Sequence, residues 1–361
     1  MPLLSHLTVI DLTANTPGPF CSSILGDLGA RVIKVEPPGG DPLRVSAPDM
    51  FAQLNRGKMS VALNLKSDAG RQRLRTLVEK ADIVLEGSRP GVAKRLGADF
   101  ETLSAINPGI VYCSISGFGQ DGPWRDRPGH DLNYVALSGY LAVQSAIEGR
   151  PYAPAVLISD MASGLYAAVA VLAAVAGRTA SGKGAYLDLS MAESALAMIT
   201  PDIGGKHQEG RFQPNVTAIP TYGLFLCRDG KWISLGIVNE DHFWERFCKA
   251  SGFQDLAEMA SLTFHDRMMQ TDRVRAMLGR AFWLKGGAEW EAILQKADVP
   301  AALVTSLNDV FSSAQFLARG VFTELAGVRY LSQPFKVNDM TPAPAAPPPA
   351  INDHEAEVFV P

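Results

Sequence analysis

The chain has 361 residues, of which 47% are hydrophobic and 19% are charged. This composition excludes a disordered or collagen-like chain and supplies enough apolar residues for one large or two moderate cores. A net charge of -4 leaves no overall basic field for a phosphate backbone, so we expect no nucleic-acid partner. The four cysteines form no CxxC pair and the histidines show no ligand spacing, so we predict buried thiols and no metal site.

The N-terminus has no basic region followed by a long apolar stretch, which predicts a cytoplasmic protein without an export signal. The most apolar stretch, Leu165–Ala176, is shorter than the roughly 20 residues that a membrane-spanning helix needs. We therefore interpret it as a buried core helix and expect no membrane partner.

Up to about residue 120, short β-branched runs alternate with helical patterns. This alternation predicts an α/β fold with a Rossmann-like large domain and a mostly parallel sheet. A dinucleotide site would need several glycines in the first strand-to-helix turn, and residues 13–19 (TANTPGP) do not provide them. The GFGQDG match at 117–122 precedes Pro123 rather than a helix start, so we interpret it as a glycine-rich loop. The predicted strands are residues 7–12, 30–36, 59–65, 81–87 and 109–116.

A second, smaller α/β domain is predicted from Tyr222, where the pattern changes. A hairpin with Asp229 and Gly230 at its tip precedes amphipathic helices. The proline-rich run 341–350 is expected to cross the surface in a semi-extended form. The predicted organisation is a large domain at 1–200, a linker at 201–221, a small domain at 222–320 and a C-terminal segment at 321–361 that returns to the large domain.

Two candidate catalytic residues, His130 and Asp131, follow the glycine-rich loop. The Pro128-Gly129 pair before them predicts a turn that presents both side chains. The alternative is structural, with Asp131 capping the next helix and His130 an ordinary loop residue. If Asp131 does not cap, we expect it to orient the imidazole.

A third candidate, Asp160, lies where an extended segment meets the start of an apolar helix. Capping alone would explain an aspartate there. The small residues at 162–164 would, however, let a ligand approach the first-turn N–H groups and the positive end of the helix dipole. Apolar neighbours would raise the basicity of Asp160, and the N–H groups after it would stabilise a developing oxyanion.

Cations gather near predicted strand ends and helix starts. Arg56 and Lys58 lie in NRGK, and Arg89 and Arg95 lie in SRPGVAKRLG. Local positive charge in an acidic chain suits a small polyphosphate ligand, although a solvated charged face would give the same pattern.

An ordered series of motifs along nearly the whole chain resembles the class III CoA-transferase superfamily. The motifs are TPGPFCSSILGDLGARVIKVEPPGGDPLR, NRGKMSVALNLK, SRPGVAKRLG, NPGIVYCSISGFGQDGP, GHDLNY, SDMASGLYAAVAVLAA and RTASGKGAYLDLSM. The resemblance implies an interlocked homodimer and an acyl-CoA substrate, with coenzyme A as part of the substrate and no prosthetic group. It also implies that the large domain holds CoA, through Pro17, Arg56, Lys58, Leu63, Ser88, Arg89, Val92 and Arg95.

Two branches of the superfamily imply different reactions. In the α-methylacyl-CoA racemases, residues matching His130 and Asp160 act as two bases on opposite faces of the α-carbon, and GHDLNY, PGPFC and the compact length favour this branch. In the transferases, the residue matching Asp160 forms an anhydride and then an aspartyl-CoA thioester, and SDMASGLYAA favours that branch. We expect racemisation of a 2-methylacyl-CoA, with CoA transfer between carboxylic acids as the alternative and a non-catalytic acyl-CoA-binding subunit as the third possibility.

The racemases also carry a glutamate in the small domain, which the segment GIVNEDHFW places at Glu240 or, in another register, at Asn239; we assign Glu240. Family members have an asparagine at the position of Gly87 and often an arginine near Pro37, and this chain does not match either. Inverting a stereocentre needs two groups with pKa values near neutrality, whereas transfer needs one carboxylate nucleophile. His130 is therefore the residue that discriminates between the two reactions.

Overall fold

The computed structural model describes residues 2–203 and 218–359 and divides the chain into two compact units. The first unit comprises Met1–Ala142, Tyr152–Ile199 and Ala314–Pro361, and the second comprises Val143–Pro151 and Thr200–Ser313. The first unit thus resumes before residue 320, where we expected the small domain to end. The expected linker at 201–221 belongs to the second unit and lies partly outside the described residues.

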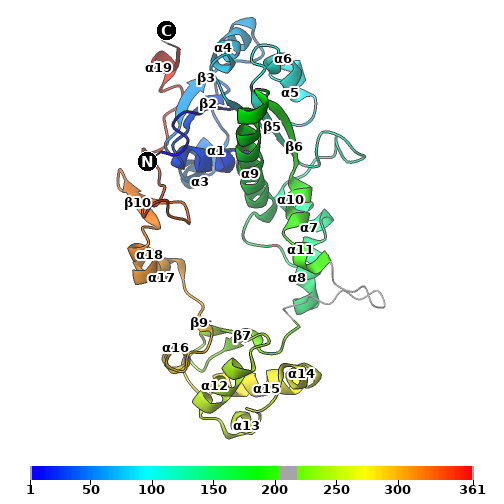
Figure 1. Ribbon diagram of the computed structural model, residues 1–361, viewed down its shortest axis with the longest axis vertical. Helices are drawn as coiled ribbons and strands as arrows, with labels where there is room; N and C mark the ends of the chain where they lie inside the picture. Colours follow the sequence, from blue (N-terminus) through cyan, green and yellow to red (C-terminus); the bar gives the residue numbers. More distant parts are fainter. Residues whose placement is uncertain (1, 204–217, 360–361) are drawn as a thin grey trace. The chain divides into compact units, whose positions relative to one another are not determined.

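The first unit is built on a six-stranded parallel sheet with the strand order β3-β2-β1-β4-β5-β6 (Figure 1). The five predicted strands are confirmed as β1 to β5, and the α/β fold class with them. We did not predict the sixth strand, β6. Its residues alternate between more and less exposed positions, whereas the inner strands that we predicted are almost wholly buried. The strands are β1 Thr8–Asp11, β2 Arg31–Glu36, β3 Met59–Ala62, β4 Ile83–Glu86, β5 Val111–Ser116 and β6 Ala185–Ser190.

Helices cover both faces of this sheet and enclose two apolar cores. α1 and α9 pack on one face, where Ile24 and Val171 lie in the same core. α4 and α6 contribute Leu74 and Leu103 to the core on the other face. The helices of this unit are α1 Pro17–Asp27, α2 Leu43–Ser46, α3 Pro48–Asn55, α4 Asp68–Val78, α5 Val92–Arg95, α6 Phe100–Ser104, α7 Asp131–Leu137, α9 Ile158–Ser181, α10 Met191–Ala197, α18 Ala314–Ala318 and α19 Glu355–Phe359.

The apolar stretch that we interpreted as a buried core helix is the middle of α9. The helix is longer than predicted, and its segment Ile158–Arg178 is 21 residues long and apolar enough to cross a membrane by length and composition. The length of α9 therefore does not exclude a membrane-spanning helix, contrary to our prediction. The core assignment is correct for one face only, because Ala167 and Val171 are buried whereas Leu165 and Val169 are 50% and 61% exposed.

The second unit contains a three-stranded antiparallel sheet and a compact helical layer. The predicted hairpin is confirmed as β7 and β8, with Gly230 at its tip in the left-handed conformation. A third strand, β9, pairs with β8 and was not predicted. Aromatic rings fill the core, with Phe225 stacked on Phe282 at a centroid distance of 5.0 Å. The elements are α11 Thr200–Ile203, β7 Tyr222–Leu226, β8 Trp232–Gly236, α12 Asp241–Ser251, α13 Gln254–Ala257, α14 Phe264–Met269, α15 Thr271–Phe282, α16 Gly287–Lys296, β9 Ala301–Leu303 and α17 Leu307–Ser312, and α8 Tyr140–Glu148 spans the boundary between the units.

The C-terminal segment forms the hairpin of β10 Phe322–Leu325 and β11 Val328–Leu331 and then runs along the edge strand β3. The Ala62 N–H donates to Asn352 Oδ1 at 2.8 Å, and the His354 N–H donates to the Ser60 carbonyl at 3.1 Å. The proline-rich run forms no helix or strand, as predicted, and the Pro349 carbonyl accepts a bond from Arg44. This segment therefore satisfies backbone groups that an edge strand would otherwise expose.

Buried charges replace apolar side chains on the α1 side of β1 and β2. Lys58 donates to Asp11 at 3.1 Å, to the Pro19 carbonyl at 3.1 Å and to Asn55 at 2.9 Å. Burial opposes ionisation of Asp11, but Lys58 and Lys34 together hold the pKa of Asp11 well below its usual range. Burial also lowers the pKa of Lys58 to about 8, against the attraction of Asp11. These groups tie β1 and the first turn of α1 to the segment before β3.

We expect the Lys58→Met variant to lose about 3–5 kcal/mol of unfolding free energy, because it removes the cation that bonds the buried Asp11 carboxylate and leaves only Lys34, among the described residues, near this charge. Urea denaturation measures this loss. Lys80→Met, which makes the same substitution at an exposed lysine, is the control and should change stability by less than about 0.5 kcal/mol. Equal stabilities of the two variants would contradict the prediction.

Candidate active site

The N-terminal ends of α1, α7 and α9 meet around Asp160. Asp160 lies in the first turn of α9, and its N–H donates to Asp131 Oδ1 at 3.1 Å. Thr16 is the N-cap residue of α1, and its side chain hydrogen-bonds to Asp160 instead of capping its own helix. Residues that are far apart in the sequence therefore share one site.

Close packing of α1 against α9 brings these groups together. Gly164 lies one turn after Asp160, and a Cβ atom at this position would lie 2.6 Å from the Pro17 carbonyl oxygen and 2.8 Å from Phe20 Cδ1. Only glycine allows so close an approach of the two backbones. The predicted role for the small residues after Asp160 was ligand access, whereas in the structure Gly164 serves helix packing.

The Asp160 carboxylate is half-buried and unusually basic. Burial and the charge of Asp131 raise the pKa of Asp160 to about 6, while the Thr16 hydrogen bond and the charge of His130 oppose that rise. At pH 7 the carboxylate is therefore mostly ionised but more basic than an exposed aspartate. This basicity suits a nucleophile or a general base.

The capping interpretations of the two aspartates are wrong. The N-cap residue of α7 is His130, and that of α9 is Leu157. Asp131 is the first residue of α7, and its Oδ1 accepts the Asp160 N–H. Its expected role in orienting the imidazole of His130 stays a prediction. His130 is exposed, and its N–H donates to Asn133 Oδ1 at 3.0 Å.

The expected oxyanion donors are already engaged. The Met161 N–H donates to the Leu157 carbonyl at 3.0 Å, within the first turn of α9. The Asp160 N–H is taken by Asp131. The first-turn N–H groups after Asp160 therefore do not serve as we predicted, and the Thr16 hydroxyl and the positive end of the α9 dipole remain.

Tyr134 is a residue of this site that the sequence interpretation missed. Its hydroxyl donates to the Gly129 carbonyl at 2.7 Å, and its pKa is raised by burial and by the charge of Asp160. A Cβ atom at Gly117 or Gly129 would lie within 2.6 Å of the Tyr134 side chain. In the sequence, only these two glycines in the flanking motifs could have indicated Tyr134, because they leave room for its ring.

Two residues that the resemblance assigned to CoA have protein partners. Arg56 is buried and forms an ion pair with Asp27 at 2.6 Å. Lys58 donates to three protein oxygens in the buried network described above. Leu63 is also buried, in the core beneath α4, whereas Pro17 opens α1 next to the site. Contacts of these four residues with CoA stay predictions.

The other assigned residues lie on the loop after β4 and on α5. The Ser88 N–H donates to the buried Glu86 side chain at 2.9 Å, which fixes the loop, while Arg89 and Arg95 are exposed and Val92 is partly exposed. A Cβ atom at Gly91 would lie 3.7 Å from Arg95 Nη1 and 4.0 Å from Arg125 Nη2. Arg125, which we did not assign, therefore joins Arg95 beside this loop. Their positive charges suit phosphate groups.

Glu240 belongs to the second unit, whereas His130, Asp131 and Asp160 belong to the first. Glu240 precedes α12, and its side chain accepts the Val238 N–H at 3.0 Å. Asn239, the alternative assignment, is exposed. The role of Glu240 stays a prediction.

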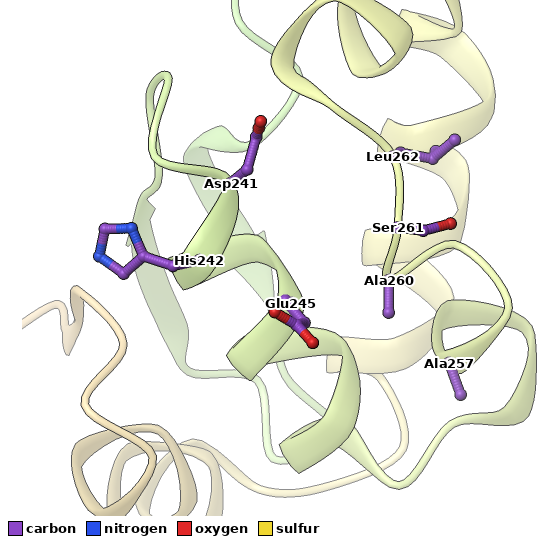
Figure 2. Close-up of a pocket in the computed structure, with 7 residues that line it drawn as sticks. All are labelled: Asp241, His242, Glu245, Ala257, Ala260, Ser261 and Leu262. Atoms are coloured by element: carbon purple, nitrogen blue, oxygen red, sulfur yellow. The ribbon is translucent and has the colours of Figure 1, made fainter.

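The second unit also carries a shallow depression of about 510 Å³ beside α12 (Figure 2). The His242 ring points away from its other lining residues, and Asp241 is paired with the buried Arg267 at 2.7 Å. Within residues 2–203 and 218–359, no group of three His, Cys, Asp or Glu side chains is placed to hold a metal ion.

Comparison with known proteins relates the whole chain to one family. A sequence model described as CoA-transferase family III matches residues 4–355. The chain is 33% identical to an acetyl-CoA:oxalate CoA-transferase of Acetobacter aceti, over 94% of this chain and 91% of that protein. It is 31% identical to a succinyl-CoA:glutarate CoA-transferase of Mus musculus, over 99% of this chain and 86% of that protein. The crystal structure of a CAIB/BAIF family protein from Brucella suis has a TM-score of 0.87 at 29% identity and covers 99% of this chain and 98% of that one.

We expect Asp131→Asn to lower the pKa of Asp160 from about 6 toward the usual aspartate range, because it removes the neighbouring negative charge and keeps an acceptor for the Asp160 N–H. Carbodiimide coupling modifies protonated carboxyl groups, so the pH dependence of Asp160 labelling, read by peptide mass spectrometry, measures this pKa. Asp121→Asn, an exposed position, is the control. An unchanged or higher midpoint in Asp131→Asn would contradict the electrostatic account.

Proposed function

Because the chain belongs to CoA-transferase family III, we propose that it transfers CoA between carboxylic acids with Asp160 as the nucleophile. The observation that carries the proposal is the Asp160 carboxylate, half-buried, mostly ionised at pH 7 and placed at the start of α9. A single activated carboxylate is the group that this reaction needs.

The reaction proceeds through two covalent states of Asp160. A carboxylate oxygen attacks the donor thioester carbonyl and expels CoA thiolate, which gives a mixed anhydride. The thiolate then attacks the Asp160 carbonyl, so that the donor acid leaves as a carboxylate and an aspartyl-CoA thioester remains. The acceptor acid reverses these two steps, takes up CoA and regenerates the Asp160 carboxylate.

Residues around Asp160 have separate tasks in this scheme. Burial and the charge of Asp131 raise the basicity of the attacking oxygen. Thr16 holds the carboxylate, and its hydroxyl can donate to the oxyanion that forms when the thiolate attacks the Asp160 carbonyl. Arg89, Arg95 and Arg125 would hold the CoA phosphates beside the loop after β4.

The curated relatives favour transfer over the racemisation that we expected from the sequence, because their names describe CoA-transferases. The contact of Asp131 with the Asp160 N–H also fits transfer, since it places beside Asp160 a charge that raises the basicity of the nucleophile. A non-catalytic acyl-CoA-binding role is less well supported, because binding alone does not need a basic carboxylate at the meeting point of three helices.

A homodimer is part of the proposal. Leu165 and Val169 on α9 are more exposed than large apolar side chains usually are, and Tyr166 between them is 40% exposed. A second copy of the chain covering this face would remove the apolar area from water, in agreement with the interlocked dimer that the resemblance implies. A cytoplasmic location stays a prediction.

We expect Asp160→Asn to lower CoA transfer from acetyl-CoA to succinate or glutarate more than about 10³-fold, and His130→Ala to lower it less than about 10-fold. Product acyl-CoA, quantified by chromatography, measures both. The same samples are incubated with one 2-methylacyl-CoA in D2O without an acceptor acid. Exchange at the α-carbon that either substitution abolishes, together with absent transfer to a panel of acids, would identify a racemase and overturn the proposal.

A further inference from the structure

The loop between β1 and α1 carries Thr16 to Asp160, and buried charged side chains hold this loop from below. Lys34 Nζ donates to the Thr13 carbonyl at 3.0 Å and forms an ion pair with Asp41 Oδ2 at 2.8 Å. The side chains of Lys34 and Asp41 are 0% and 1% exposed. Lys34 lies in β2 and Asp41 in the loop after it, so neither residue adjoins the site in sequence.

The other carboxylate oxygen of Asp41 accepts hydrogen bonds from backbone groups, one of them in the same loop. Asp41 Oδ1 accepts the Leu43 N–H at 3.0 Å and, in a longer bond, the Asn15 N–H at 3.5 Å. Asn15 has a φ of 63°, in the left-handed region that residues other than glycine rarely adopt. The backbone is therefore held on both sides of Ala14 in a conformation that it would not favour alone.

The conformation of this loop explains why the Thr16 side chain bonds to Asp160 rather than to its own helix. The side chain of an N-cap threonine normally accepts an N–H of its own helix, but that of Thr16 makes no such bond and interacts with Asp160. Gly18 contributes to the same arrangement, since a Cβ atom there would lie 2.3 Å from the Thr13 side chain.

We propose that Lys34 and Asp41 are positioning residues for Asp160, acting through the Thr13–Thr16 loop and the Thr16 hydroxyl. The geometry of this path does not depend on the proposed function; only its consequence for CoA transfer does. A buried ion pair is not needed for stability alone, because an apolar pair of similar volume can serve as well. Here both charged groups also bond backbone groups of the loop.

The proposal predicts the direction in which the pKa of Asp160 changes when the Lys34–Asp41 pair is removed. Loss of the Lys34–Asp41 pair releases the loop, Thr16 no longer bonds to the carboxylate, and the pKa of Asp160 rises above about 6. Within the described part of the chain, the other titratable groups that interact with Asp160 are Asp131, His130 and Tyr134, all from α7 or its N-cap, and the substitutions leave them in place.

The test is a double-mutant comparison of Asp160 ionisation in the full chain, by pH-dependent carbodiimide labelling. Thr16→Val removes the hydroxyl, and Lys34→Met with Asp41→Asn replaces the pair without changing the net charge. Each is expected to raise the midpoint by about 0.5–1 pH unit, and the triple variant no further than Thr16→Val alone. The matched control is Asp82→Asn, which weakens an ion pair with Arg178 and a bond to the Thr8 N–H at the other end of β1. Its midpoint should stay at the wild-type value.

The proposal would be overturned if the Lys34→Met, Asp41→Asn variant folds and its Asp160 labelling midpoint equals that of the wild type. It would also be overturned if the shift of the triple variant equals the sum of the two separate shifts. If the pair variant does not fold, Asp41→Asn alone is measured, and a shift smaller than that of Thr16→Val but in the same direction is expected; no shift would again overturn it. Labelling uses no CoA. Failure of CoA transfer with the predicted shifts intact would therefore refute the proposed function and leave this inference standing.

Discussion

The contact between the Asp131 carboxylate and the backbone N–H of Asp160 is the constraint on which the site depends. It holds a second negative charge beside a half-buried carboxylate at the start of a long helix. Burial and this charge raise the pKa of Asp160 to about 6, against the Thr16 hydrogen bond and the charge of His130. The carboxylate is thus ionised at neutral pH and still basic enough to attack a thioester carbonyl.

The rest of the first unit keeps that constraint in place. Gly164 allows α9 to pack against the first turn of α1, and the network of Asp11, Lys58 and Lys34 fixes that turn and the loop before it. Burying so many charges contributes little to net stability. Their value lies in orientation, because each charged group also bonds a backbone or hydroxyl group near the site.

Much of this arrangement was predictable from the sequence, and the exceptions have physical reasons. The strands β1 to β5 and the hairpin of β7 and β8 follow from apolar runs and turn residues, whereas the joint role of Asp160 and His130 stays a prediction. Asp131, Arg56 and Lys58 each bond a backbone or side-chain group from a segment distant in the sequence, and no local pattern predicts such a partner. Edge strand β6 and the exposed face of α9 do not have the burial pattern of inner elements, so the sequence did not predict them. Tyr134 is indicated only by Gly117 and Gly129, which leave room for its ring.

Transfer of oxygen to Asp160 is the most direct test of its role as nucleophile. The acceptor acid, labelled with 18O in both carboxylate oxygens, is incubated with the protein and an unlabelled acyl-CoA, and the peptide carrying Asp160 is analysed by mass spectrometry. In the anhydride mechanism the acceptor leaves one of its oxygens on Asp160 at each turnover, so label should accumulate in that carboxylate. Acyl-CoA product formed without any 18O in Asp160 would contradict the account.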